Sequence, residues 1–219
     1  MSLETNDGPE DDATALHAAV REGDVIKIEC LITAQGVDVD AKIKGRGGPL
    51  FTAETCGRIK SMRALIELGA DVDAVNESLV TPLMSASSYG RWRMVELLLQ
   101  AGANFDFVRL SDNATPLKFC SHTKMGYKCA ELLIVAGADP NFPSHDSQSA
   151  LMIAARKNRP ELLEILLKAG ADPEQRCELP WALGWTALDH AINEKRTKAR
   201  EILQRVTVSL PKASPGMVP

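Results

Sequence analysis

The sequence is poor in aromatic residues, has no long apolar run and carries no excess of basic charge. Phe, Trp and Tyr make up only 5% of the 219 residues, so small and aliphatic side chains are expected to form the core. No apolar run reaches the roughly 20 residues that span a membrane. The chain starts acidic, with no basic residue before Arg21, which argues against a signal peptide. The net charge of −4 gives no overall field for nucleic acid.

The chain also lacks the residue spacings of metal and catalytic sites. Its five cysteines are odd in number and include no Cys-x-x-Cys pair, so we expect reduced thiols in a soluble intracellular protein. The four histidines show no metal-ligand spacing. Cys120 and His122 stand two residues apart and would lie on different faces of a helix, which disfavours a nucleophile pair. We therefore expect no catalytic residue, no metal and no cofactor.

What the sequence does contain is one short phrase repeated along its length. It reads TALHAA at residues 14–19, TPLMSA at 81–86 and TALDHA at 186–191. The copies begin at residues 14, 48, 81, 115, 149 and 186, with steps of 34, 33, 34, 34 and 37. A fixed period in this range is typical of a solenoid of small stacked units and argues against a single globular core.

A second phrase follows each opening phrase in the middle of the chain. Gly-Ala-Asp or Gly-Ala-Asn stands at residues 69–71, 102–104, 137–139 and 170–172. Each glycine ends an apolar stretch, which fits the left-handed residue at a helix C-terminus. Each opening Thr or Ser can cap a helix, with Pro or Ala at the first helical position. Each unit is therefore predicted to be a helix, a short turn, a second helix, a glycine stop and a hairpin.

These phrases resemble the ankyrin repeat over residues 12–206. The resemblance implies an all-α, ankyrin-repeat solenoid of six stacked helix-turn-helix units with connecting β-hairpins and a concave groove. Residues 1–11 are expected to be a disordered acidic N-terminal tail, and residues 207–219 a flexible Pro-containing C-terminal tail. The polar first and sixth units are expected to cap the stack.

The resemblance also implies an adaptor without catalysis that binds an unidentified protein or peptide through hairpin tips and the concave inner-helix face. We expect no nucleic-acid partner, a monomer, and a cytoplasmic location with the nucleus as the alternative. The sequence leaves open whether Trp181 contacts a partner or folds back over the last unit, and it places Trp185 facing the groove. The predicted partner-binding residues are Lys42, Lys44, Arg46, Val75, Val80, Tyr89, Val108, Arg109, Leu110, Trp181 and Trp185.

Basic residues that recur after the inter-helix turn support an alternative function. Stacked in register, they would form a positive stripe for an anion or ligand, although a solvated helix start explains the same residues. The residues of this stripe are Arg58, Arg91, Arg159 and Arg196. Separately, Asn141 resembles the hairpin asparagine that a hydroxylase modifies in some ankyrin proteins, and hairpin geometry alone also explains an Asn there.

Departures from the repeated pattern predict where the stack is weak. The fourth position of the opening phrase is a histidine only in the first unit, at His17. In the family this histidine ties neighbouring units together, so its loss elsewhere predicts weaker stacking. The fourth unit is one or two residues longer than its peers between the two helices, which predicts a bulged turn. We therefore expect stepwise unfolding centred on the middle units.

Overall fold

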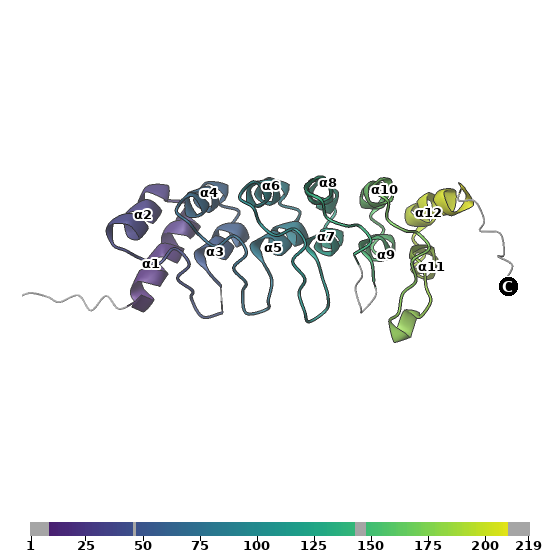
Figure 1. Cartoon of the computed structure of the whole chain (residues 1–219), viewed down its shortest axis with the longest axis horizontal. Helices are drawn as coiled ribbons and strands as arrows, with labels where there is room; N and C mark the ends of the chain where they lie inside the picture. The colour runs from purple at the N-terminus through teal and green to yellow at the C-terminus, as the bar shows by residue number, and fades with distance from the viewer. Residues whose placement is uncertain (1–8, 46, 143–147, 210–219) are drawn as a thin grey trace, which may run out of the picture.

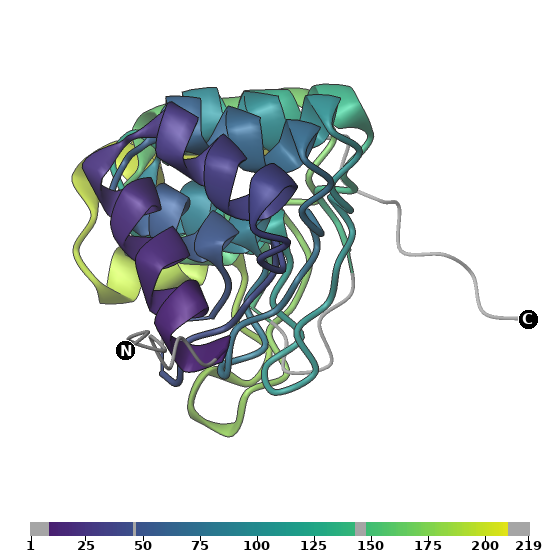
Figure 2. The same ribbon diagram turned by 90° about the vertical axis from the view of Figure 1, so that its left-hand side faces the viewer.

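The chain folds into a row of helix pairs whose connecting loops project from one edge. The computed structural model describes residues 9–45, 47–142 and 148–209. Odd-numbered helices form an inner layer next to the loops, and even-numbered helices form an outer layer behind them (Figure 1). Viewed from the end of the row, the loops extend away from the helices on one side (Figure 2). This arrangement is the helical solenoid that the sequence predicts.

The helices follow the repeat along the chain. The inner layer contains α1 (Pro9–Glu22), α3 (Pro49–Thr55), α5 (Pro82–Tyr89), α7 (Pro116–Phe119), α9 (Ala150–Arg156) and α11 (Ala187–Asn193). The outer layer contains α2 (Val25–Glu29), α4 (Ile59–Glu67), α6 (Trp92–Gln100), α8 (Gly126–Ala136), α10 (Pro160–Lys168) and α12 (Thr197–Ser209). Three short turns complete the set: η1 (Cys30–Ala34), η2 (Cys120–His122) and η3 (Pro180–Ala182). We number the units one to six after these successive pairs.

The predicted caps start the inner helices. The hydroxyl of Thr81 accepts a hydrogen bond from the backbone N–H of Met84 at 3.2 Å, and Ser149 accepts one in the same way from Met152 at 3.3 Å. Thr186 and Asp189 form a reciprocal capping box at the start of α11. Each such bond satisfies a backbone donor that the first turn of a helix leaves unpaired. The capping prediction is confirmed at Thr81, Thr115, Ser149 and Thr186 and is wrong at Thr14, because α1 begins at Pro9 and Thr14 lies inside that helix.

The connecting loops are hairpins held by backbone and side-chain hydrogen bonds. Within the described residues they contain isolated bridges, such as Ile43 to Gly47, and no paired strands. Acidic and amide side chains link one loop to the next. The backbone N–H of Asn104 donates to the carboxylate of Asp73 at 3.0 Å, and that of Asp172 donates to Asn141 Oδ1 at 2.7 Å. These bonds keep successive loops in register along the edge of the solenoid.

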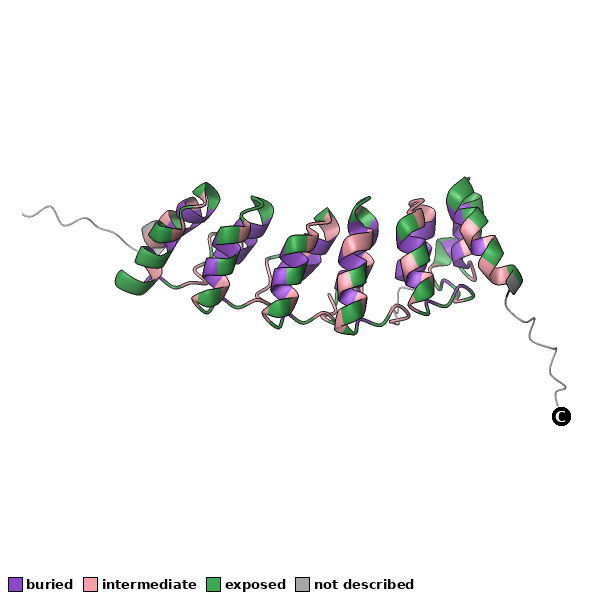
Figure 3. Cartoon of the chain, turned by 90° about the horizontal axis from the view of Figure 1, so that it is seen from above, coloured by how far each residue is buried: buried purple, intermediate pink, exposed green. Residues whose placement is uncertain are grey.

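A continuous core of aliphatic and small side chains runs between the two layers. Leu16, Leu83, Leu98, Leu133 and Leu151 are at most 1% exposed. On the outer helices, buried and exposed faces alternate around each helix (Figure 3). The low aromatic content of the sequence is consistent with this core, because thin stacked helices leave room for aliphatic side chains and little for large rings. Each unit therefore buries its apolar side chains between its own two helices and against the neighbouring units.

The fourth unit carries the predicted irregular turn. Its inner helix α7 is short and ends in the 3-10 turn η2 before α8 begins at Gly126. A Cβ atom added to Gly126 would lie 1.7 Å from the carbonyl oxygen of Cys120, so the turn closes only around a glycine. The outer helix α8 has 11 residues, whereas α6 has 9. The extra residues are thus accommodated by the 3-10 turn at the end of the first helix and by a longer second helix.

The two end helices extend beyond the expected repeat region, and His17 joins the first two units. α1 begins at Pro9 and α12 ends at Ser209, so each helix runs beyond the boundary of 12 or 206 expected from the sequence. His17 lies fully buried and bonds to Thr52 Oγ1 at 2.7 Å and to the carbonyl of Ala41 at 3.0 Å. His17 therefore ties unit one to unit two, as the resemblance implies.

Candidate protein-interaction surface

A hollow of about 200 Å³ opens on the inner face of units four and five, between α7, α9 and the adjoining hairpins. We call it the inner-face hollow. Both cationic and apolar side chains line it, contributed by three hairpins and two inner helices. Its main lining residues are Arg109, Lys118, Phe119, His122, Ile153 and Leu179. A mixed lining of this kind suits a partner that offers both a negative and an apolar group.

Arg109 is held in place at the rim of this hollow. Its guanidinium donates to both carboxylate oxygens of Asp112, at 2.8 and 2.5 Å, and lies 5.0 Å from the ring centre of Phe119. The hydrogen bond from Arg109 lowers the pKa of Asp112, so this carboxylate stays ionised. The Phe119 ring meets the His122 ring edge-on at 5.3 Å. A bidentate ion pair and an aromatic contact thus fix the side chains before any partner arrives.

The long hairpin between units five and six places two tryptophans beside the same face. Trp181, on η3, remains 55% exposed, yet its ring lies 5.8 Å from the His190 ring and 5.7 Å from the guanidinium of Arg156. Trp181 therefore both folds back onto α9 and α11 and presents a large exposed surface. Trp185 is half-buried, packs against the core and meets His190 at 5.3 Å. Trp185 consequently contributes more to packing than its predicted position facing the groove suggested.

Positive charge is concentrated around this face. Desolvation lowers the pKa of His122, and the nearby Lys157, Arg109 and Arg156 lower it further. Desolvation also lowers the pKa of Lys157, assisted by Arg156 and Arg159. These mutual effects arise because like charges close together disfavour protonation of one another. The inner face of units four and five is therefore locally cationic in a chain that is acidic overall.

The arginines of the predicted anion stripe form hydrogen bonds between neighbouring units. Arg58 donates to the carbonyl of Arg21 at 2.8 Å, Arg159 to that of His122 at 3.3 Å and Arg196 to that of Arg156 at 2.9 Å. Each carbonyl belongs to the inner-helix end or turn of the preceding unit. Arg91 follows the same rule by donating to the carbonyl of Thr55 at 3.0 Å. The stripe thus forms a series of links that join each unit to the one before it.

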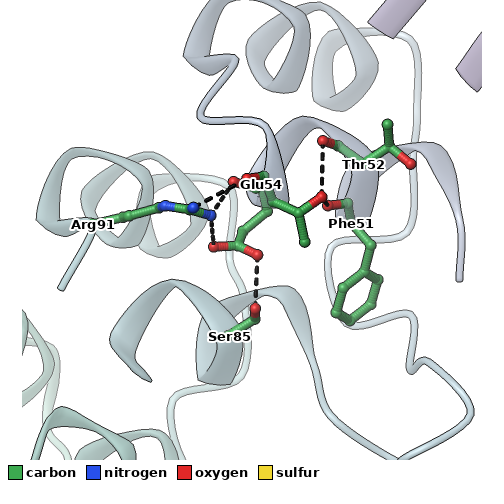
Figure 4. Close-up of polar contacts among 6 residues, drawn as sticks. Phe51, Thr52, Glu54, Ser85 and Arg91 are labelled. Carbon is green, nitrogen blue, oxygen red and sulfur yellow. Dashed lines mark hydrogen bonds and ion pairs between the residues drawn. The ribbon is translucent and has the colours of Figure 1, made fainter. Parts of the chain in front are cut away.

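Arg91 also pairs with a buried acid that the sequence analysis did not single out. Glu54 is fully buried, and its carboxylate accepts from Arg91 at 2.5 Å and from the hydroxyl of Ser85 at 2.6 Å (Figure 4). Arg91 additionally donates to the Glu54 carbonyl. Burial raises the pKa of Glu54, whereas Ser85 and Arg91 act to lower it. This cluster links units two and three at a place where Phe51 replaces the consensus histidine.

The remaining predicted tip residues differ in exposure. Leu110 is 82% exposed and Tyr89 61% exposed, with Arg91 lying 4.8 Å from the Tyr89 ring centre. Val75 and Val108 are half-buried, and Val80 packs on a small cluster formed by Met84, Ala114 and Phe119. Lys42 and Lys44 line a separate cleft of about 690 Å³ beside the start of α1. Arg46 lies outside the described residues.

The structure brings together residues that sequence reasoning missed. Of the residues around the hollow, only Arg109 and Trp181 were predicted as partner-binding. Lys118, Phe119, His122, Arg156 and Lys157 belong to inner helices or their ends and were not among them. A signal existed in the register of the repeat: His122 and Arg156 both stand seven residues after the first residue of their opening phrases, at 115 and 149. Asn141 uses its side-chain N–H₂ to bond the carbonyl of Gly170 at 2.8 Å, and its hydroxylation remains a prediction.

The helices lie in pairs, the hairpins project from one edge of the row, and apolar and cationic side chains line the inner face. These features define a helical repeat protein of the protein-binding type. Ankyrin family profiles match most of the chain: "Ankyrin repeat" over 11–44, "Ankyrin repeats (many copies)" over 65–107 and "Ankyrin repeats (3 copies)" over 117–209. The chain belongs to the ankyrin repeat family. Ankyrin repeats are generally protein–protein interaction modules. Among the described residues, no helix has the length and apolar character needed to cross a bilayer.

Individual relatives match only in part. An ankyrin repeat protein of Rickettsia felis is 38% identical over 55 residues, which is 24% of this chain and 21% of the relative. Glycerophosphocholine phosphodiesterase gde1 of Schizosaccharomyces pombe is 47% identical over 58 residues, 26% of this chain and 5% of that protein. The matches thus span a small part of the length of these curated relatives.

One solved structure extends the likeness of fold over most of the chain. It is the predatory endopeptidase Bd0816 of Bdellovibrio bacteriovorus in complex with the immunity protein Bd3460. A chain of that complex matches with a TM-score of 0.75 at 24% identity, covering 87% of this chain and 97% of the other. At this level of identity the likeness concerns the fold alone.

Proposed function

We propose that this chain is a non-catalytic adaptor that binds a partner protein through its inner helices and hairpin tips, with units four to six as the main contact. The observation that carries this proposal is the inner-face hollow, where apolar and cationic side chains from several units converge. Leu110 and Trp181 flank this face as exposed apolar groups on hairpins. Exposed apolar side chains beside arginines are the usual anchors of protein interfaces.

The alternative, an anion- or ligand-binding module that uses the basic stripe, has weaker support. Arg58, Arg91, Arg159 and Arg196 all donate to backbone carbonyls of the preceding unit. A bound anion would compete with these bonds, so occupying the stripe would weaken the stack. This arrangement favours the adaptor. We further propose that the chain acts as a monomer in the cytoplasm.

Selection from a random peptide display library tests the adaptor proposal. Peptides selected on the unmodified protein should lose most of their affinity for the variant Leu110→Ser with Trp181→Ser. A matched control replaces two apolar residues that are at least as exposed on outer helices, Ile26→Ser with Val135→Ser. Equal loss in both variants, or loss in the control alone, would contradict binding through the inner face and tips.

A further inference from the structure

The inner face of units four and five carries a cluster of positive groups, which we call the cationic groove. Its positive members are Arg109, Lys118, Arg156 and Lys157, which surround the His122 imidazole. Arg109 and Lys118 line the hollow, and Arg156 and Lys157 stand at the end of α9, close enough to His122 to lower its pKa. Arg156 lies close enough to Trp181 to join the hollow to the exposed indole of the next hairpin, at 5.7 Å. The groove therefore continues from the third hairpin to the fifth.

The acidic side chains nearby are already engaged. Asp112 forms its bidentate pair with Arg109, and Asp189 caps α11 through Thr186. Glu194 lies 3.5 Å from the guanidinium of Arg196. These carboxylates satisfy specific donors, and among the described residues neither Arg156 nor Lys157 forms an ion pair with an acidic side chain. A ligand that supplies carboxylates would relieve the repulsion among the clustered cations.

Apolar surface is interleaved with the charges. Phe119, Ile153 and Leu179 line the hollow, and Trp181 stands exposed at its far end. The Phe119 ring has Arg109 over it, and Arg156 lies over the Trp181 ring. Because a guanidinium group lies over one face of each ring, that face is not open to the stacking of a nucleobase. The rings instead shape apolar recesses between positive groups.

Building on the proposed adaptor function, we propose that the cationic groove binds an extended acidic segment of a partner protein in which every second residue is in turn acidic (Asp or Glu) and apolar. In an extended chain, successive side chains point to opposite sides, so residues two apart share a face. A carboxylate near Arg156 and Lys157 can then be combined with an apolar side chain in the hollow. The hollow of about 200 Å³ accommodates side chains rather than a folded element.

The test uses a fluorescein-labelled peptide with the repeat Glu-Ser-Leu-Ser, which places Glu and Leu in turn on one face of an extended chain, and a second peptide with Gln in place of every Glu. Fluorescence anisotropy should show binding of the Glu peptide alone, weakening as salt is added. The double variant Arg156→Gln with Lys157→Gln should bind the Glu peptide roughly tenfold more weakly, which corresponds to a loss of about 1.4 kcal/mol in binding free energy. The control Lys60→Gln with Arg63→Gln removes the same charge from exposed positions of α4 and should bind normally.

Several outcomes would overturn the inference. These are equal binding of the Glu and Gln peptides, equal loss in both double variants, and tighter binding of a single-stranded oligonucleotide than of the Glu peptide. Self-association that disappears in Arg156→Gln with Lys157→Gln would identify a second copy of this chain as the occupant and also refute it. Library peptides that need Leu110 and Trp181 but carry no acidic residues would leave the adaptor function standing and reject the acidic segment alone.

Discussion

Arg91→Ala should destabilise the protein in a way that depends on pH, because Arg91 neutralises a buried acid. The Glu54 side chain is 0% exposed and that of Arg91 is 29% exposed. Removing one partner of a buried pair costs about 3–5 kcal/mol. Since Arg91 is partly exposed, we expect a loss near the lower end, about 3 kcal/mol at about pH 7. The loss reflects an uncompensated carboxylate that retains only the bond from Ser85.

The direction of the pH effect follows from the raised pKa of Glu54. A carboxyl whose pKa is raised in the folded state favours folding at low pH, and this contribution is lost as the pH rises through the folded pKa. Removing Arg91 raises this pKa further. Lowering the pH therefore protonates Glu54 and reduces the destabilisation of the variant. The cost of Arg91→Ala should shrink to about 1 kcal/mol at about pH 4, the value of the lost bonds to carbonyl groups.

Urea unfolding followed by circular dichroism at both pH values measures this difference. Arg58→Ala is the matched control, because Arg58 occupies the equivalent place and donates to the carbonyl of Arg21 without a buried acid. It should cost about 1 kcal/mol at either pH. If Arg91→Ala costs the same at both pH values, or no more than Arg58→Ala, the role assigned to Glu54 is wrong.

Four further predictions concern single elements of the stack. Gly126→Ala should cost more than about 4 kcal/mol in urea unfolding because its Cβ would overlap the Cys120 carbonyl, whereas Gly102→Ala, with φ +84° and open space, should cost about 1 kcal/mol. Burial lowers the pKa of His190, so its contribution to stability is lost as the pH falls below the ordinary histidine pKa of about 6.5; tryptophan fluorescence should report loosening of unit six that His190→Leu abolishes. Trp181→Ala should weaken binding of selected peptides by about 2 kcal/mol with little change in melting temperature, whereas Trp185→Ala should lower both the affinity for these peptides and the melting temperature. Hydrogen exchange should be fastest around η2 and α8, and slow exchange there would refute a weak fourth unit.

The sequence predicted the features that repeat and missed those that depend on contacts between units. Thr81 and Ser149 could be identified as caps because a cap requires only a hydroxyl followed by helix-forming residues. The glycine stops could be predicted in the same way, and Gly69 and Gly137 have positive φ angles of 92° and 113°. These features are local, so one unit suffices to recognise them.

Contacts between units could not be inferred in this way. The sequence leaves Arg58 and Arg196 as either a basic stripe or a solvated helix start, because it does not reveal that the carbonyls of the preceding unit lie within their reach. Glu54 was overlooked since its partners, Ser85 and Arg91, stand 31 and 37 residues away. The cationic groove was missed for the same reason: Arg109 and Arg156 come from different units and both come near His122 only when the stack forms.

Hydrogen exchange of the protein with and without a selected peptide tests the central claim most directly. Binding through the inner face should slow exchange in α7, α9 and the hairpins around residues 107–114 and 176–185, and leave the outer helices α8 and α10 unchanged. Slowed exchange confined to α8 and α10 would show that the partner binds the opposite side of the solenoid and would contradict the account.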